Sequence, residues 1–168
     1  SAGDWYNTAI STMAELGILK GRTPDTFVPN APITRAEFAA ICARFDTGEN
    51  AGGATFPDLA GHWAKEEVER AVSLGWIMGY EDNTFRPDKA ITRAEAVTMI
   101  NRVLQRNPQS PEDLLKDMVT WPDNQDPSRW YYLAIQEATN SHDYERTTGI
   151  YETWTQLTDD PDWTRYQN

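Results

Sequence analysis

The sequence has a single cysteine, Cys42, among its 168 residues, and no run of apolar residues long enough to span a bilayer. One thiol excludes an internal disulfide, and the missing apolar run excludes membrane insertion. Basic residues are also few, since 15 Lys and Arg stand against 26 Asp and Glu, which gives a net charge of −11. Nucleic acid is therefore not an expected partner, because binding it normally requires a basic surface.

Groups that commonly carry catalysis or bind metals are scarce as well. The only histidines are His62 and His142, and the sequence contains no metal-spaced His pair, Ser-centred elbow or phosphate loop. The acidic residues around Asp82 lack the glycine and terminal glutamate of a calcium loop. We expect a noncatalytic protein without metal or cofactor. A glycosidase stays as an alternative, because geometry rather than sequence defines its pair of carboxylates.

The negative charge is concentrated in the last third of the chain. Residues 107–168 contain twelve acidic and four basic side chains, so −8 of the −11 lies there, and nine of the aromatic residues lie there too. A disordered acidic tail is poor in aromatics, so this segment is predicted to be folded. The first two thirds are nearly neutral and can accept an anionic ligand, whereas the last third disfavours one.

An internal repeat with a period of 58 residues organises the chain. Shifting the sequence by 58 makes 13 of the 42 positions from Trp5 to Asp46 identical, including the segment Ile-Thr-Arg-Ala-Glu at 33–37 and 91–95. A weaker third copy begins at Trp121-Pro-Asp123, which matches Phe56-Pro-Asp58. We divide the chain into repeat 1 (1–46), a linker (47–55), repeat 2 (56–106), and a degenerate repeat 3 with an acidic, aromatic-rich extension (107–168).

Each clear repeat is predicted to be a helix, a loop and a second helix. In repeat 2 the first helix is expected from His62 to Leu74, with Gly75 ending it in the left-handed region. The segment from Trp76 to Ala90 is rich in turn residues and is predicted to be a loop, with Phe85 inserted into the core. The second helix is expected to begin at Thr92, and residues 112–119 are expected to form a short helix. Few segments alternate with period two, so the predicted fold class is all-α.

The Thr-Arg-Ala-Glu segments have a structural and a functional interpretation. Thr-x-x-Glu before an apolar run is a capping box, which explains Thr34 with Glu37 and Thr92 with Glu95. Arg35 and Arg93 are not explained in this way, because the first helical position disfavours a positive charge. They are candidate receptors for a carboxylate or phosphate, and the alternative is a surface ion pair with an acidic neighbour.

Other positions around the repeats also allow two interpretations. Trp5 and Trp63, with Trp130 at the equivalent place in repeat 3, either fix a helix start to the core or provide aromatic faces on which a sugar ring stacks. Asp58 and Asp123 are either helix caps or acceptors for sugar hydroxyls. Beside Tyr80 in the loop, the missing side chain of Gly79 allows close approach of a ligand.

Taken together, these motifs resemble the S-layer homology (SLH) domain. The resemblance rests on Phe56-Pro-Asp, His62-Trp-Ala, Leu74-Gly, Met78-Gly-Tyr, Thr84-Phe-Arg-Pro and Ile91-Thr-Arg-Ala-Glu in this order and spacing. Repeat 1 matches from Trp5 to Phe45 but lacks the opening Phe-Pro-Asp, and repeat 3 matches only near Trp121 and Trp130. About 90 residues are covered well.

The resemblance implies an arrangement and a function. SLH repeats form a three-pronged, pseudo-threefold arrangement around a central helix bundle, and they anchor bacterial surface proteins to secondary cell wall polysaccharide, often with pyruvate ketals. Ligand lies in grooves between adjacent repeats, with the arginine of Thr-Arg-Ala-Glu facing the acidic ketal. It implies that this chain is an extracellular, noncatalytic module for such a polysaccharide, with ligand residues Arg35, Arg93, Asp58, Trp63, Gly79, Tyr80, Trp5, Asp123 and Trp130.

Repeat 3 departs from the family pattern, and an alternative function remains. It has no third Thr-Arg-Ala-Glu, so at most two grooves are expected to carry the arginine. The alternative is a helical repeat module whose grooves hold a protein partner or another surface-layer subunit. The isolated fragment is expected to be monomeric and part of a larger surface protein.

Overall fold

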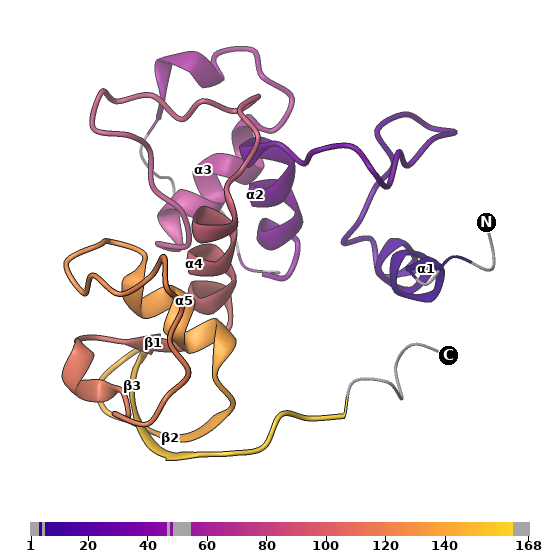
Figure 1. Cartoon of the computed structure of the whole chain (residues 1–168). Helices are drawn as coiled ribbons and strands as arrows, with labels where there is room; N and C mark the ends of the chain where they lie inside the picture. The colour runs from indigo at the N-terminus through magenta and orange to yellow at the C-terminus, as the bar shows by residue number, and fades with distance from the viewer. Residues whose placement is uncertain (1–3, 5, 47, 49–54, 163–168) are drawn as a thin grey trace. The chain divides into compact units, whose positions relative to one another are not determined.

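The computed structural model describes residues 4, 6–46, 48 and 55–162 of the chain, which form two compact units (Figure 1). Within the described residues, unit 1 runs from Asp4 to Ile91 and unit 2 from Thr92 to Asp162. Trp5, one of the predicted ligand residues, and the predicted linker from 47 to 55, apart from Gly48 and Thr55, lie outside this description. No helix among the described residues is both long and apolar enough to cross a bilayer.

Unit 1 contains three α-helices whose positions follow the repeat. They are α1 (Asn7–Glu15), α2 (Arg35–Ala43) and α3 (Lys65–Ser73), with a 3-10 turn at Pro57–Leu59. Helices α1 and α3 have the same length and are separated by the repeat period, and each ends at a glycine with positive φ, Gly17 or Gly75. The predicted helix stop at Gly75 is confirmed, although α3 begins three residues later than predicted.

Both capping boxes are present in the structure. Thr34 accepts a hydrogen bond from the backbone N–H of Glu37, and Glu37 accepts from the backbone N–H of Thr34, at the start of α2. Thr92 and Glu95 make the same pair of bonds at the start of α4 (Arg93–Val103). Each box satisfies backbone donors that the first turn of a helix leaves unpaired, and so fixes where the helix begins.

Helix packing is staggered with respect to the sequence repeats. In unit 1, α2 of repeat 1 packs against α3 of repeat 2. The contact is close because Ala36, Ala39 and Ala40 of α2 are at most 1% exposed, and α3 contributes the fully buried Val68. In unit 2, α4 of repeat 2 packs against α5 (Tyr132–Thr139) of repeat 3. The second helix of one repeat therefore covers the first helix of the next.

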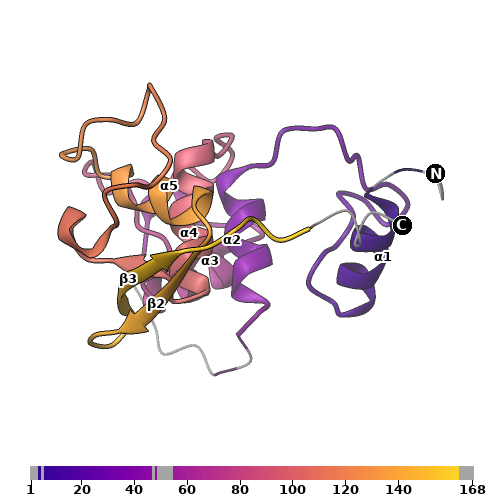
Figure 2. The ribbon, with the colours of Figure 1, turned by 60° about the horizontal axis from the view of Figure 1, so that its bottom comes forward.

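Unit 2 combines these two helices with a small sheet (Figure 2). The strands are β1 (Asn107–Pro108), β2 (His142–Arg146) and β3 (Tyr151–Leu157), in the order β1-β3-β2. Strand β3 pairs parallel to β1 and antiparallel to β2. The apolar core beside the sheet is formed by Leu114, Tyr132 and Trp154.

The described part of the chain is mainly helical, as predicted, and differs from the prediction in the last third. The helix expected over 112–119 is wrong, because that segment contains only a 3-10 turn at Pro111–Asp113. The sheet was not predicted, because the strand β3 alternates in burial but its inward positions hold Glu152 as well as Trp154. A carboxylate at an inward position breaks the alternation of apolar and polar residues by which a strand is predicted from sequence. The three-pronged arrangement stays a prediction.

A buried charge centre lies beside the apolar core of unit 2. Glu137 of α5, His142 of β2 and Glu152 of β3 have side chains at most 3% exposed. Arg106 joins both carboxylates, at 3.1 Å from Glu137 and 2.8 Å from Glu152. Trp154 stacks on His142 with ring centroids 3.9 Å apart and donates its indole N–H to Glu137. The centre thus ties the helix and the sheet together.

Opposing influences set the protonation of His142 in this centre. Burial lowers the pKa of His142, but the carboxylates of Glu137 and Glu152, at 3.3 and 3.4 Å from Nε2, outweigh it and raise the pKa above its ordinary value of 6.5. Arg106 lies 2.7 Å from the same nitrogen, a contact that only the neutral ring accepts. The two carboxylates dominate, so the net shift of the pKa of His142 is upward.

The raised pKa predicts that unit 2 is more stable in mild acid than in base. Because the pKa of His142 is higher in the folded protein than in the unfolded chain, its protonation stabilises the fold below pH 6.5. This stability is lost as the pH rises through the pKa of the folded protein. The free energy of unfolding, measured with urea and tryptophan fluorescence, should fall as the pH rises above 6.5. In His142→Gln this slope should be smaller. Equal slopes in the two proteins would contradict the assignment.

Candidate functional site

The loop from Trp76 to Ala90 of repeat 2 is held by a carboxylate from the start of its own repeat. Asp58 accepts hydrogen bonds from the backbone N–H groups of Phe85 and Arg86, at 3.0 and 2.7 Å. Arg86 has φ of 57°, a conformation that is uncommon for a residue with a side chain and needs support. The side chain of Phe85 is fully buried, as predicted. Asp58 therefore supports this strained turn.

Gly79 lies against the core of unit 1. A Cβ at Gly79 would stand only 2.1 Å from the ring of Phe56, which itself packs against Phe85. No other residue fits at position 79 without displacing that ring. The contact with Phe56 thus explains the glycine without a ligand, whereas its predicted role in ligand approach stays a prediction.

Arg35 joins repeat 1 to the loop of repeat 2. Its guanidinium donates to the carbonyl oxygens of Phe85 at 2.9 Å and Met78 at 3.0 Å, and Arg35 is 3% exposed. The same group lies over the rings of Tyr80 and Phe85, at 4.6 and 4.8 Å from their centroids. Arg35 is therefore buried rather than exposed on the surface. Its contacts favour a role in positioning the loop.

Three cationic side chains, from α2 and from the loop itself, lie near the ring of Tyr80. Besides Arg35, the charged groups of Arg86 and Lys89 lie 4.1 and 5.0 Å from the ring centroid, and Lys89 donates to the phenol oxygen at 2.9 Å. Arg86 also pairs with Asp82, whose pKa is lowered to about 2 by hydrogen bonds from Thr84 and Arg86. The ring of Tyr80 is thus surrounded by three cationic side chains, of which Arg86 is paired with an acidic neighbour.

A groove of about 500 Å³ lies in unit 1 between parts of repeat 1 and repeat 2. Its walls come from the loop of repeat 1, from α2 and from the start of α3. Trp63 lines the groove and is 60% exposed, so its ring is not inserted into the core. The cationic side chains of the wall are Lys20, Arg22 and Arg44.

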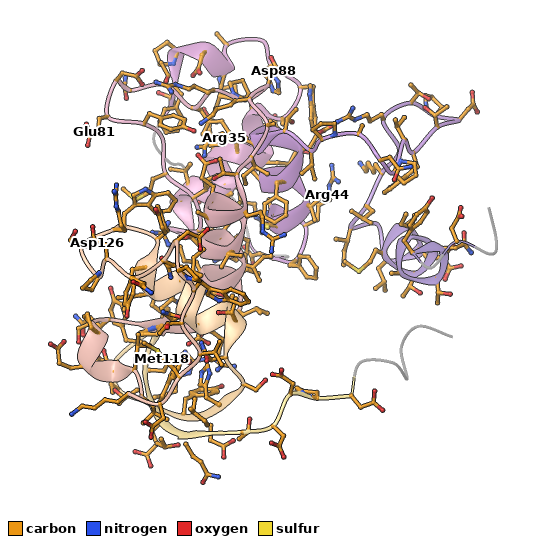
Figure 3. All side chains as sticks on the ribbon, viewed as in Figure 1. Arg35, Arg44, Glu81, Asp88, Met118 and Asp126 are labelled. Carbon is orange, nitrogen blue, oxygen red and sulfur yellow. The ribbon has the colours of Figure 1, made fainter. Side chains whose placement is uncertain are left out.

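The charges of the groove are partly paired. Arg22 makes two hydrogen bonds with the carboxylate of Glu37, at 2.9 and 3.0 Å. Partial burial raises the pKa of Glu37, but the bonds from Arg22 and Thr34 outweigh it and lower the pKa below its ordinary value. Arg44 follows the last residue of α2, at the opposite end of the helix from Arg35 (Figure 3), and donates to the carbonyl of Ile18.

The remaining predicted residues belong to unit 2. Trp130 precedes α5 and is 64% exposed, so it matches Trp63 in exposure as well as in sequence position. Asp123 is exposed. Arg93 is also exposed at the start of α4, and its guanidinium makes no hydrogen bond or ion pair within the described chain. Arg93 therefore differs from its counterpart Arg35, which is buried.

The structure brings together only part of the predicted set. Arg35, Asp58, Gly79 and Tyr80 meet in the loop of repeat 2, and Trp63 lines the groove. Sequence reasoning did not select Lys20, Arg22 and Arg44 for this groove, although the repetition of Arg44 at Arg102 was a signal. The charge centre of unit 2 had no signal, because its members are scattered between 106 and 152.

The structure thus defines a tandem helix–loop–helix protein in which Arg35 of repeat 1 and Asp58 of repeat 2 hold the loop of repeat 2. The sequence model of the S-layer homology domain matches residues 1–39 and 55–97. These residues are two repeats of the S-layer homology domain family, and the chain belongs to that family.

Similar proteins are bacterial surface proteins by name. The chain is 36% identical over 152 residues to cell surface glycoprotein 1 of Acetivibrio thermocellus, a match that covers 83% of this chain and 6% of the relative. It is 37% identical over 147 residues to the cellulosome-anchoring protein of the same organism, covering 84% and 32%. An S-layer protein of Bacillus licheniformis is 33% identical over 100 residues, covering 57% and 11%. The chain therefore spans less than a third of each relative.

Removing Asp58 should destabilise unit 1 through its loop. Asp58→Ala leaves the backbone donors of Phe85 and Arg86 without their carboxylate, so the free energy of unfolding should fall by about 2 kcal/mol in urea titrations. The matched control is Asp88→Ala, because the Asp88 side chain is 87% exposed and only touches His62 at 3.4 Å. A similar loss in both variants would contradict this role of Asp58.

Proposed function

We propose that this chain is a noncatalytic module that holds a surface protein on the bacterial cell wall by binding secondary cell wall polysaccharide. The observation that carries the proposal is the exposure of Trp63 and Trp130, which are 60% and 64% exposed at equivalent positions of two repeats. Tryptophan at a repeated position is ordinarily a core residue, and a large exposed indole at two such positions is a surface available for stacking. Membership of the S-layer homology family supports the same function.

The groove beside Trp63 suits an acidic sugar. An aromatic face binds the apolar face of a pyranose ring, and nearby cations bind its carboxylate. Arg44 and Lys20 line the groove; Arg22 is paired with Glu37 at 2.9 Å, and Arg44 lies 3.8 Å from the carboxylate of Glu67, a looser pair. A pyruvate ketal carries one carboxylate on the sugar ring. We therefore propose a pyruvylated sugar as the ligand of this groove, with Trp63 as its platform and Arg44 as a charge partner.

The two Thr-Arg-Ala-Glu arginines receive different roles in this proposal. Arg35 holds the loop of repeat 2 from within the fold and so positions Tyr80 and its cations. Arg93 is exposed and is the better candidate for direct contact with an anion. Asp123 and Trp130 belong with Arg93 to unit 2, and the strongly acidic composition there makes this the weaker of the two ligand surfaces.

A protein partner is the second candidate. The names of several relatives favour it, because they refer to protein assemblies on the cell surface. Three relatives are named as S-layer proteins of Bacillus species, and another is named as cellulosome-anchoring. A groove that holds a peptide would also contain an exposed aromatic residue. Extraction of the polysaccharide distinguishes the two, because a wall that lacks the polysaccharide should lose the sugar-binding module and retain a protein-binding one.

The tryptophans should be required for wall binding. In a pull-down on purified Gram-positive walls, Trp63→Ala should bind about tenfold more weakly, since truncating a contact tryptophan costs more than about 1 kcal/mol. Trp63→Ala with Trp130→Ala should bind more weakly still. Trp121→Ala is the control, because Trp121 is 44% exposed but does not share the repeat position. Unchanged binding of the double variant would refute the proposed platform.

The charge partners are tested on the same walls, before and after extraction of the polysaccharide. Arg44→Ala and Arg93→Ala should each weaken binding about ten- to a hundredfold at their own site, the scale of hydrogen bonds to a charged group. Arg35→Ala should also weaken binding, but with a loss of stability that circular dichroism during heating detects. If wild-type binding survives extraction of the polysaccharide, the partner is a protein or the peptidoglycan itself.

A further inference from the structure

The buried charge centre of unit 2 has the composition of a metal site. Glu137, His142 and Glu152 each place one ligand atom within 4.8 Å of the others, and their side chains are at most 3% exposed. They come from α5, β2 and β3, so the fold brings them together rather than a local motif. Buried carboxylates are ordinarily paired with a cation or coordinate a metal. Two carboxylates and an imidazole at one buried point therefore form a candidate site for a metal ion.

The ring of His142 is oriented as the ring of a metal ligand is. Its Nδ1 lies 2.7 Å from the carbonyl oxygen of Asn140, which can only accept, so Nδ1 carries a hydrogen. A histidine that binds a metal almost always donates its second ring N–H to such an acceptor, which fixes the tautomer and the ring. Trp154 stacks on the same ring, with the two centroids 3.9 Å apart. In the neutral ring, Nε2 therefore directs its lone pair towards Glu137 and Glu152.

The distances at Nε2 of His142 fit a tetrahedral ion. Zinc binds histidine nitrogen and carboxylate oxygen at about 2.0–2.2 Å, so two ligand atoms of a tetrahedral site stand about 3.3–3.6 Å apart. Nε2 lies 3.3 Å from Oε2 of Glu137 and 3.4 Å from Oε1 of Glu152. Both separations are longer than an N–H···O hydrogen bond ordinarily is. Two edges of the ligand set thus already have the length that a zinc ion requires.

Arg106 competes with a metal at one contact and would orient its ligands at the others. Its Nε donates to both oxygens of Glu152, at 2.8 and 2.9 Å, and Nη2 lies 3.1 Å from Oε1 of Glu137. The other oxygen of Glu137, Oε2, accepts from the indole N–H of Trp154 at 2.8 Å. Only the 2.7 Å contact of Nη2 with Nε2 of His142 uses the lone pair that a metal needs. The Arg106 side chain is 27% exposed, so it can leave this contact towards solvent and stay with the carboxylates.

The kinds of donor atom favour zinc over calcium or magnesium. Calcium and magnesium are bound by six or more oxygen ligands, whereas imidazole is a ligand for zinc and the neighbouring transition metals. Two carboxylates with one imidazole are three protein ligands, and a water molecule is the usual fourth ligand of zinc in such a set. Two carboxylates also carry one more negative charge than Arg106 balances. Either a proton on Nε2 of His142 or a metal ion supplies the missing positive charge.

We propose that Glu137, His142 and Glu152 bind one zinc ion, with Arg106 and Trp154 as hydrogen-bond donors to the ligating carboxylates. The ion would bind Nε2 of His142, Oε2 of Glu137 and Oε1 of Glu152, and it would join α5 to strands β2 and β3. Its role is structural, because an ion that binds only the folded chain stabilises unit 2. The sequence predicts a protein without metal, and this site departs from that prediction because its ligands follow no known metal-binding motif.

Isothermal titration calorimetry of the whole chain with zinc chloride, after treatment with EDTA and its removal, tests the proposal. The wild type should bind one equivalent of zinc. His142→Gln and Glu152→Gln should each bind at least about a hundredfold more weakly, because the loss of an outer hydrogen-bond partner alone costs about ten- to a hundredfold. His62→Gln is the matched control, since it removes the other imidazole of the chain, which lies in unit 1, and should bind like the wild type.

Thermal unfolding and cobalt spectra separate a lost ligand from lost folding. Zinc in excess should raise the melting temperature of the wild type and of His62→Gln, but not that of His142→Gln, whose melting in EDTA shows whether the variant folds. Cobalt(II) in place of zinc should give the visible absorption bands of a tetrahedral ion in the wild type alone of these two histidine-centre proteins, wild type and His142→Gln. A wild type that binds no zinc would overturn the proposal, and Arg106 would then be the cation that balances the centre. Equal zinc affinity of His142→Gln and the wild type would overturn it as well.

Discussion

The bond between a helix of one repeat and the loop of the next is the interaction on which unit 1 depends. The guanidinium of Arg35 donates hydrogen bonds to backbone carbonyls of the loop, and the carboxylate of Asp58 accepts hydrogen bonds from backbone N–H groups of the same loop. A segment of turn residues with little regular structure is thus fixed by one cation and one anion. Because Arg35 comes from repeat 1 and Asp58 from repeat 2, repeat 2 does not complete its loop by itself.

This arrangement separates the residues that build the site from those that remain accessible. Arginine and aspartate, the obvious candidates for ligand chemistry, are largely used in holding the loop of repeat 2. The exposed groups are Trp63 and Trp130 at the helix starts, with Lys20 and Arg22 on the wall of the groove. A repeat motif therefore identifies where a site lies more reliably than it identifies which side chain touches the ligand. The same Thr-Arg-Ala-Glu segment is internal in one repeat and exposed in the other, because only one of them has a loop to enter.

Much of the helical part could be predicted from the sequence, since its signals are local. The capping residues, Gly75 and the turn residues between 76 and 90 each specify a conformation through their own chemistry. The partner of each helix could not be predicted, because the staggered packing is a property of the assembled chain. The sheet of unit 2 was missed for another reason. Glu152 is buried through ion pairs with Arg106 and His142, residues that lie far from it in sequence, so no local pattern marks its position as internal. The exposure of Trp63 was likewise undecided until the surrounding packing was known.

Staggered packing has a consequence for how such chains gain and lose repeats. Duplicating or deleting one sequence period adds or removes one complete helix–helix interface. After the change, the second helix of each repeat still packs against the first helix of the repeat that follows it. The number of repeats can therefore change during evolution without the invention of a new contact. The hairpin of β2 and β3 and the charge centre of unit 2 follow α5, at the position where repeat 2 has its loop. An unrelated structure thus takes the place of the loop in repeat 3.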